Sequence, residues 1–302
     1  MIIYKNTNIK KEHKNGVIAV GNFDGLHLGH QKVFEKARLK AKNNKLKFGL
    51  LTFEPVPVMY FNSKITNHRI NSLEQKKYYL KKLNLDFLII IKFNKPFSQI
   101  SAENFIKKII FKKLNTKYIF VSKNFRFGKK RTGNINTLKK FEKTYSYKTM
   151  IVSPHKKYKK IVSSSLIRKY LSKGNVTQAR NLLGRSWVIE GKVVKGDQRG
   201  KKIGYPTCNI NFNNYILPRL GVYAVLVETN SFKKKGIANA GFRPTFNGKK
   251  PLLEVNIFGI NLNLYKKIIK ISFIKFIRRE KKFKGIVQLK QQIKKDIDKA
   301  KK

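Results

Sequence analysis

Apolar runs alternate with amphipathic helical patterns along the first half of the sequence. Short runs bounded by glycine or polar residues predict strands at 17–20, 46–53, 86–93, 117–121 and 147–152. Helical spacing of apolar residues predicts helices near 73–83, 100–113 and 134–143. Because parallel strands need a crossover connection, this order predicts a parallel sheet with helices on both faces and ligands at the carboxyl ends of its strands.

A glycine-punctuated turn follows the first predicted strand, in the stretch VIAVGNFDGLHLGH at 17–30. The turn contains Gly21, Gly25 and Gly29. Glycine permits a tight bend and a close approach of the backbone to a ligand. Helical spacing from His30 onward predicts a helix whose buried face holds Val33, Phe34, Ala37 and Ala41. The start of that helix offers free N–H groups and the positive end of a dipole, so the turn is suited to bind phosphate.

His27 and His30 add two hydrogen-bond donors to this turn. A chance pair of surface histidines and a metal-binding pair are the alternative interpretations. The metal interpretation is the weaker, because no further ligand cluster follows at metal-binding spacing and the chain has one cysteine.

A second helix start lies in the stretch VSSSLIRKYLSKGN at 162–175. Serines before an apolar periodic run predict a helix N-cap, and Gly174 predicts the helix end. The serines are Ser163, Ser164 and Ser165. A serine-capped helix start is also an anion site, with Arg168 one turn further on to meet a phosphate through two hydrogen bonds.

The second half, beginning near Gly184, is rich in predicted strands and carries another glycine pattern. The stretch WVIEGKVVKGDQRGKKIGYPTCNI at 187–210 holds Gly191, Gly196, Gly200 and Gly204, followed by Pro206, Thr207 and Asn209. No helical pattern follows, so these glycines suit a loop that wraps a nucleotide rather than a Rossmann turn. At the chain end, an apolar stripe predicts a docked amphipathic helix with Ile286, Leu289, Ile293 and Ile297.

Charge is the most unusual feature of the composition, at +54 with a pI near 10.5. Such a charge favours nucleic acid or an anionic membrane as partner. Only 12 of the 69 basic residues are Arg, however, and the lysines are spread along the whole chain, which is typical of a solvated surface. One cysteine excludes an intrachain disulfide, and no apolar run has the length of a signal peptide or a membrane span, so we expect a cytoplasmic protein.

GNFDGLHLGH resembles the signature of the bifunctional bacterial riboflavin kinases/FAD synthetases, members of the nucleotidyltransferase group with an H-x-G-H motif. SSSLIR resembles the second phosphate motif of that group, S-S-T-x-I-R, with Ser165 in place of threonine. The stretch VSKNFRFGKKRTGN at 121–134 resembles the family's flavin and phosphate loop, with Asn124 where an acidic residue is usual. A strand with one buried face is the alternative for any single residue of this loop.

The resemblance implies roles for residues of the first half. His27 and His30 would bind ATP phosphates and offset charge that develops at the α-phosphorus. The remaining ATP-binding residues would be Gly21, Phe23, Asp24, Gly29, Ser163, Ser164, Ser165 and Arg168. The flavin-binding residues would be Asn124, Phe125, Arg126, Phe127 and Arg131.

The 187–210 stretch resembles the riboflavin kinase signature G-x-x-x-G-x-x-x-G-x-P-T-A-N, with Cys208 in place of alanine. This implies ATP binding by Gly191, Gly196, Gly200, Gly204 and Pro206, and Mg²⁺ binding by Thr207 and Asn209. Glu254 falls at the position of the family's catalytic glutamate and would accept the proton of the riboflavin 5′-hydroxyl. Arg278 would contact flavin or phosphate. Asn256, Gly259 and Lys266 depart from the family pattern.

The resemblance covers nearly the whole chain and implies two domains. Residues 1–183 would form a Rossmann-like nucleotidyltransferase domain, with a parallel sheet covered by helices on both faces. Residues 184–302 would form an antiparallel β-barrel riboflavin kinase domain with a terminal helix. The second domain would convert riboflavin and ATP to FMN, and the first would convert FMN and ATP to FAD and pyrophosphate. We expect a monomer or weak self-association, and neither a specific nucleic acid nor a membrane as partner.

Three other interpretations remain open. An aminoacyl-tRNA synthetase relative shares H-x-G-H, but it needs a lysine-rich second signature and a tRNA-binding appendage. A basic nucleic-acid-binding protein would bind with a steep salt dependence and turn over no flavin. One of the two domains could also have lost its activity, and Asn124, Asn256 and Gly259 are where such a loss would be sought.

Overall fold

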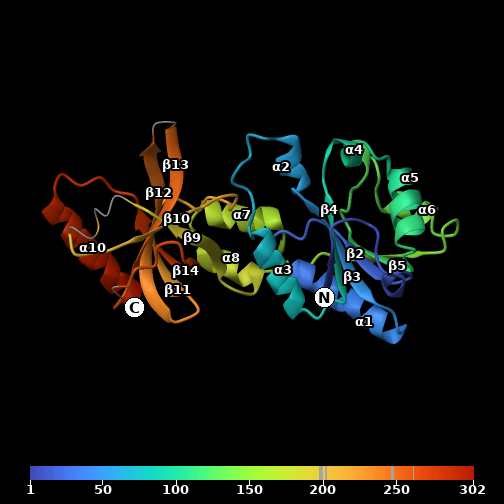
Figure 1. Cartoon of the computed structure of the whole chain (residues 1–302), viewed down its shortest axis with the longest axis horizontal. Coiled ribbons are helices and arrows are strands. Elements are labelled where there is room, and N and C mark those ends of the chain that lie inside the picture. The colour runs from blue at the N-terminus through green and yellow to red at the C-terminus, as the bar shows by residue number, and fades with distance from the viewer. Residues whose placement is uncertain (197–199, 201–202, 246–247, 261) are drawn as a thin grey trace. The chain divides into compact units, whose positions relative to one another are not determined.

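The computed structural model describes residues 1–196, 200, 203–245, 248–260 and 262–302, with the side chains of 243–245 and 248–249 outside the description. The chain forms two compact units (Figure 1). Unit 1 comprises Met1–Ile65 and Leu73–Val162, and unit 2 comprises Thr66–Ser72 and Ser163–Lys302. Parts of the predicted nucleotide loop (197–199, 201–202) and of the later kinase-like segments (246–247, 261) lie outside the described residues.

A six-stranded sheet in the order β1-β4-β3-β2-β5-β6 forms the centre of unit 1. Its strands are β1 Ile2–Tyr4, β2 Val17–Val20, β3 Phe48–Glu54, β4 Phe87–Lys92, β5 Tyr118–Ser122 and β6 Lys148–Val152. All neighbouring strands pair in parallel, which confirms the predicted parallel sheet. The sequence pattern does not predict β1, because an edge strand of three partly exposed residues leaves no long apolar run.

Helices connect these strands. They are α1 Leu28–Asn43, α2 Pro57–Phe61, α3 Leu73–Lys82, α4 Lys95–Ser98, α5 Ala102–Asn104 and α6 Ile135–Lys140. Short 3-10 turns occupy Lys11–His13 and Lys129–Arg131, and β7 Lys156–Lys157 pairs with β8 Lys160–Ile161. The helix predicted at 100–113 is α5 followed by a π-helical stretch, Phe105–Lys113.

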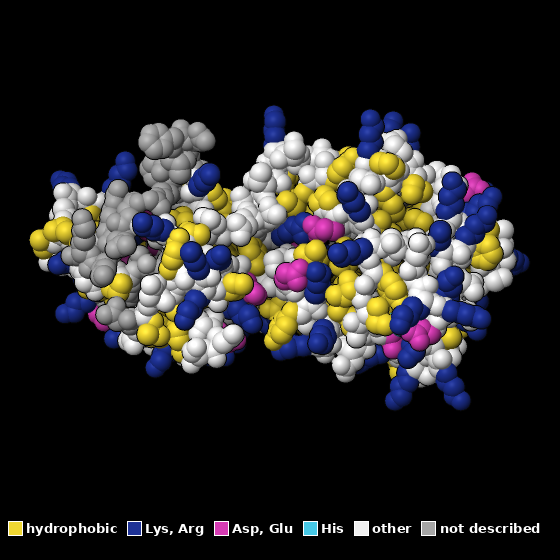
Figure 2. Space-filling view, viewed as in Figure 1, with side chains coloured by type: hydrophobic (Ala, Val, Ile, Leu, Met, Phe, Trp, Pro, Cys, Tyr) yellow, Lys and Arg dark blue, Asp and Glu magenta, His cyan; other side chains and the backbone are white. Residues whose placement is uncertain are grey.

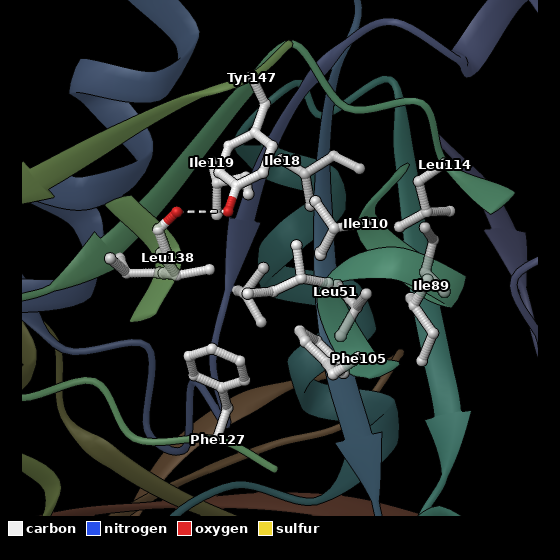
Figure 3. Packing of buried hydrophobic residues seen from close by; sticks show 14 of the residues in the cluster. Ile18, Leu51, Ile89, Phe105, Ile110, Leu114, Ile119, Phe127, Leu138 and Tyr147 are labelled. Atoms are coloured by element: carbon white, nitrogen blue, oxygen red, sulfur yellow. Dashed lines mark hydrogen bonds between the residues drawn. The ribbon is translucent and has the colours of Figure 1, made fainter. Parts of the chain in front are cut away.

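Each side of the sheet has its own apolar core, because successive residues of a strand face opposite sides. On one side, Ile18 and Val20 of β2 pack with Leu51, Ile89 and Phe105, as Figure 3 shows for part of this cluster. On the other side, Val17 and Ala19 pack with the predicted face of α1, namely Val33, Phe34, Ala37 and Ala41. The predicted covering of both faces is confirmed.

A closed antiparallel barrel in the order β10-β13-β12-β11-β14-β9 forms the centre of unit 2. Its strands are β9 Trp187–Val194, β10 Cys208–Asn211, β11 Gly221–Glu228, β12 Lys233–Thr245, β13 Gly248–Ile257 and β14 Ile268–Arg279. The rings of Trp187 and Tyr223 lie 4.7 and 5.1 Å from that of Phe273, and all three side chains are fully buried. The predicted barrel is therefore confirmed.

Three described helices accompany the barrel: α7 Ser164–Ser172, α8 Val176–Leu183 and α10 Ile286–Lys301. α10 docks through Ile293, Ile297 and Ala300 on barrel residues Val222 and Ile237. The predicted apolar stripe is wrong at its first member, because Ile286 is 56% exposed at the start of the helix.

One segment from the middle of the first half, Thr66–Ser72, belongs to unit 2. The Arg69 amide donates to the Asn214 carbonyl at 2.8 Å, and the Arg69 carbonyl accepts from the Ile216 amide at 2.7 Å. The Trp187 indole N–H donates to the Ile70 carbonyl at 2.9 Å. Sequence patterns did not indicate this excursion, because backbone pairing with distant residues leaves no local periodicity.

Candidate active sites

The histidine turn lies at the carboxyl end of β2, as expected for a ligand site in a parallel sheet. α1 begins at Leu28, slightly earlier than predicted, and His27 is its N-cap. The Nδ1 atom of His27 accepts a hydrogen bond from the His30 amide at 3.3 Å, and the two rings stack with centroids 3.6 Å apart. An accepting Nδ1 carries no hydrogen, so the hydrogen of the neutral ring is on Nε2.

The backbone of this turn is unusual at three positions. Phe23, Gly25 and Leu26 have positive φ values of 46, 83 and 44°. The Phe23 ring meets that of His30 edge-on, with centroids 5.3 Å apart. A Cβ on Gly29 would lie 3.1 Å from His27 Nδ1 and 3.2 Å from the Val162 carbonyl oxygen, so glycine at this position serves close packing.

Asp24 is buried in the same turn, at 5% exposure. Gln31 on α1 donates from Nε2 to the Leu26 carbonyl at 2.9 Å and so fixes the second half of the turn.

A buried lysine near this turn escaped the sequence analysis. Lys76 on α3 is 2% exposed, and its Nζ donates to the Asn22 carbonyl at 2.8 Å. Thr52 at the end of β3 donates to the same carbonyl at 3.2 Å. The run KKYYLKK gives no local signal that distinguishes Lys76 from its surface neighbours.

A cluster of aromatic side chains lies at and beyond the carboxyl ends of β3 and β4. Phe93 has ring contacts with Phe53, Tyr60, Phe61 and Phe97, at centroid distances of 5.2–6.1 Å. The Phe61 side chain is 66% exposed. We call these five side chains the edge aromatic cluster. No sequence pattern indicates this cluster, because its members come from three separate stretches of the chain.

The loop predicted to bind flavin is an ordered reversal of the chain. Phe127 and Gly133 exchange two backbone hydrogen bonds, of 3.0 and 2.9 Å. The Phe125 and Phe127 rings stack with centroids 5.4 Å apart, and Phe127, at 7% exposure, also belongs to the core. The polar members of the prediction, Asn124, Arg126 and Arg131, are exposed.

The serine motif begins α7, as predicted. The Ser163 Oγ accepts from the Leu166 amide at 3.2 Å and caps the helix. Arg168 donates from Nε to the His68 carbonyl at 2.9 Å. Gly174 directly after the C-cap has a φ of 79°, in agreement with its predicted place at the helix end.

Three polar residues lie side by side on neighbouring barrel strands. In the strand register, Glu254 of β13 is opposite Asn209 of β10 and opposite Asn239 of β12. Glu254 is exposed, whereas Asn209 is 6% exposed and its Oδ1 has no hydrogen-bond partner among the described residues. A buried amide oxygen without a partner is costly, so this atom fits a role as ligand to a cation.

The glycines of the predicted nucleotide loop serve different purposes. A Cβ on Gly196 would meet Asn209 Nδ2, and one on Gly200 would meet the Tyr205 carbonyl, both at less than van der Waals contact. Gly204 has a φ of 89° and open space around it. Gly191 lies within β9 instead of the loop, where Ile210 of β10 leaves no room for a side chain.

Asn256, one of the departures from the family pattern, contacts the end of this loop. The Asn256 side chain donates to the Pro206 carbonyl at 2.7 Å, and Gly259 has a φ of 67°. Pro206 and Thr207 are exposed. Burial raises the pKa of the Cys208 thiol, which therefore stays neutral as a packed side chain.

Arg278, a predicted flavin or phosphate contact, pairs with a carboxylate in this structure. Its Nε lies 3.1 and 2.8 Å from the two carboxylate oxygens of Asp296 on α10, and its Nη2 lies 2.8 Å from Oδ2. Nη1 donates to the Arg279 carbonyl at 2.9 Å. These contacts connect the end of β14 to the terminal helix.

The described residues contain neither a metal-binding cluster nor a membrane-spanning helix. Among them, no three His, Cys, Asp or Glu side chains gather as a metal cluster. Within the same ranges, no helix has the length and apolar character needed to cross a bilayer.

The parallel sheet with its histidine turn and the closed barrel with its Asn–Glu–Asn row define a two-part, nucleotide-using transferase. The family model for FAD synthetase matches residues 9–166, and that for riboflavin kinase matches residues 183–302. The chain belongs to the family of bifunctional riboflavin kinases/FMN adenylyltransferases, and it makes FMN and FAD.

Relatives match over nearly the full length. The bifunctional riboflavin kinase/FMN adenylyltransferase of Buchnera aphidicola subsp. Schizaphis graminum is 43% identical, over 98% of this chain and 96% of its own length. That of Bacillus subtilis is 39% identical, over 97% and 93%. A solved Streptococcus pneumoniae structure described as a macrolide-efflux protein has a TM-score of 0.87 at 30% identity, covering 99% of this chain and 98% of its own, which supports the two-part fold.

Proposed function

We propose that the two activities are divided between the histidine turn and the Asn–Glu–Asn row of the barrel, which consists of Asn209, Glu254 and Asn239. AMP transfer to FMN takes place at the histidine turn, and phosphorylation of riboflavin takes place at the barrel. The observation that carries the first assignment is the stacked pair of His27 and His30 at the N-terminus of α1, where the two rings join the positive end of the helix dipole.

In the proposed AMP transfer, an FMN phosphate oxygen attacks the α-phosphorus of ATP and pyrophosphate leaves. The reaction needs no protein nucleophile, because FMN supplies the attacking group. His27 Nε2 and the His30 ring donate to oxygens on which charge develops, and donors fixed in advance stabilise that charge without reorganisation. The other proposed ATP contacts in unit 1 are Gly21, Phe23, Asp24 and Gly29. Ser163, Ser164, Ser165 and Arg168 are proposed phosphate contacts at the start of α7.

The edge aromatic cluster offers a surface for the flavin ring of FMN. Aromatic rings prefer offset or edge-on contacts with other rings, and an exposed Phe61 beside Phe93 leaves one such face open. Phe125, stacked on Phe127, offers a second aromatic face in the loop after β5. Asn124, Arg126 and Arg131 remain proposed contacts for the polar parts of FMN.

In the proposed kinase reaction, Glu254 takes the proton from the riboflavin 5′-hydroxyl. The hydroxyl oxygen attacks the γ-phosphorus of ATP, and ADP leaves. The oxygen atoms Asn209 Oδ1 and Thr207 Oγ1 are ligands of the type that Mg²⁺ prefers, and Oδ1, which has no hydrogen-bond partner within the described part of the chain, supports the fit. When bound, Mg²⁺ supplies charge neutralisation on the ATP phosphates. Gly191, Gly196, Gly200, Gly204 and Pro206 remain proposed ATP contacts, with Gly191 lying in β9 and the others in the loop that follows it.

Two substitutions test this division. H30A is expected to lower FAD formation from FMN at least about a hundredfold, the scale of losing a fixed donor, while FMN formation from riboflavin continues. E254Q keeps the shape of the side chain and removes the base, so it should reduce FMN formation and spare FAD formation when FMN is supplied. Chromatographic separation of riboflavin, FMN and FAD over time measures both reactions. Loss of both activities in either folded variant would contradict the division.

We further propose a domain boundary near Gly184, so that two segments of the first domain's chain, Thr66–Ser72 and 163–183, lie in unit 2. A reducing, cytoplasmic setting fits the single Cys208. We also propose a monomer or weakly self-associating protein, and a sedimentation profile with a stable larger species at low concentration would count against it.

A further inference from the structure

Among the residues that the structure describes, one lysine of this lysine-rich chain is almost completely buried. Lys76 on α3 is 2% exposed, whereas Lys81 on the same helix is exposed. Removing an ammonium group from water is costly unless fixed polar partners replace the lost hydration. A chain with abundant surface lysine does not need this one for charge, so its position calls for a reason in its contacts.

Two contacts of Lys76 involve one peptide of the histidine turn. Lys76 Nζ lies 2.8 Å from the Asn22 carbonyl oxygen, and Thr52 Oγ1 lies 3.2 Å from the same atom. Nζ and the Thr52 hydroxyl are themselves 3.5 Å apart. α3 and β3 thus hold a single carbonyl from two directions.

This carbonyl belongs to the peptide that enters the unusual part of the turn. The next residue, Phe23, has a φ of 46°, which a residue with a side chain keeps only where its surroundings hold it. The Phe23 ring then packs edge-on against His30. A continuous series of contacts therefore leads from Lys76 through Asn22 and Phe23 to a histidine of the site.

We propose that Lys76, with Thr52, is a positioning residue for AMP transfer. It holds the Asn22 peptide so that the turn presents its amides and His30 to ATP, and its charge lies one hydrogen bond from the phosphate-binding turn. This rests on the proposed role of the histidine turn. Lys76 acts through Asn22 and Phe23 and is not assigned a contact with substrate.

The kinetic test compares K76M, T52V and the double variant with the matched surface control K81M. K76M is expected to raise the KM for ATP in FAD formation about tenfold and to lower kcat, because a charge-assisted hydrogen bond is lost. In K76M, the KM for FMN and the rate of FMN formation from riboflavin should stay within about twofold of the parent values. In K81M, the same two quantities should also stay within about twofold of the parent values. T52V should show a smaller change in the same direction.

The double variant tests whether Lys76 and Thr52 both act through the Asn22 carbonyl. Because Lys76 and Thr52 act on the same oxygen, their effects on KM for ATP should be less than the product of the single effects. Fully multiplicative effects, an unchanged KM for ATP in K76M, or an equal loss of FMN formation would each overturn the proposal. A variant that is only partly folded would have a lower kcat and an unchanged KM for ATP. The KM for ATP therefore distinguishes a loss of positioning from a loss of folded enzyme.

Hydrogen exchange of a peptide spanning residues 21–30 tests the positioning without activity. Exchange should be faster in K76M and T52V than in the parent and K81M, and equal exchange in all four would overturn the proposal. If the parent makes no FAD from FMN, the proposed role of the turn fails, whereas the exchange result still decides whether Lys76 holds it.

Discussion

At the scale of single residues, the glycines show that one residue type meets several demands. Gly25 adopts a positive φ, whereas Gly29 lets His27 and the Val162 carbonyl approach the helix start. Gly191 makes room for Ile210 in the barrel wall. Glycine spacing alone therefore identifies positions without a side chain but not the reason for them.

Gly29 allows a residue-scale prediction. G29A should leave global stability nearly unchanged, because the helix gains up to about 1 kcal/mol of propensity while the new methyl group crowds His27. FAD formation should fall about tenfold as the His27 ring is displaced, with FMN formation retained. Steady-state kinetics of both reactions measure this. G285A is the control, since a Cβ there meets nothing within 4 Å, and an effect of G29A no larger than that of G285A would contradict the packing argument.

At the scale of elements, the attachment of α10 depends on polar as well as apolar contacts. Ile293, Ile297 and Ala300 supply the apolar contact with the barrel. Asp296 is 1% exposed and receives Arg278 through Nε and Nη2, and Gln292 donates to it at 2.9 Å. A buried carboxylate with such partners fixes the rotation of the helix on the barrel.

This pairing gives an element-scale prediction. D296N should lower the free energy of unfolding by about 2 kcal/mol, because the partly buried guanidinium loses its charged partner. Protection of α10 from hydrogen exchange should fall in parallel. Asp298 is exposed on the same helix, so D298N is the control and should change stability by less than about 0.5 kcal/mol. Equal effects of the two variants would show that the pair does not hold the helix.

At the scale of the whole molecule, positive charge is dispersed rather than concentrated. Lys and Arg side chains are spread over the visible faces of both units in Figure 2, among few acidic ones. A net charge of +54 disfavours a compact chain through self-repulsion and attracts anionic substrates. Added salt should weaken both effects, since it screens exposed charges.

The whole-molecule prediction concerns ionic strength. Raising KCl from about 0.05 to about 0.5 M should raise the thermal midpoint and, at the same time, the KM for ATP of both reactions. Thermal unfolding and initial rates at matched pH measure the two effects. A midpoint that falls with salt would mean that attractive ion pairs outweigh self-repulsion.

The sequence by itself determined the features that repeat locally. Strand and helix periodicity gave the parallel sheet, the capping serine gave the start of α7, and the histidine turn gave the phosphate-binding hypothesis. Each depends on neighbours a few residues apart, so a short stretch contains the whole signal. The roles of individual site residues follow from the family resemblance.

Only the tertiary structure decided which of 57 lysines is buried beside the turn, which aromatic side chains gather at the edge of the sheet, and that Thr66–Ser72 joins unit 2. It also showed Arg278 paired with Asp296 and Gly191 inside a strand. These features arise from contacts between residues far apart in the chain. Such contacts impose no local pattern, because packing selects a residue for the space and partners around it and not for its neighbours in sequence.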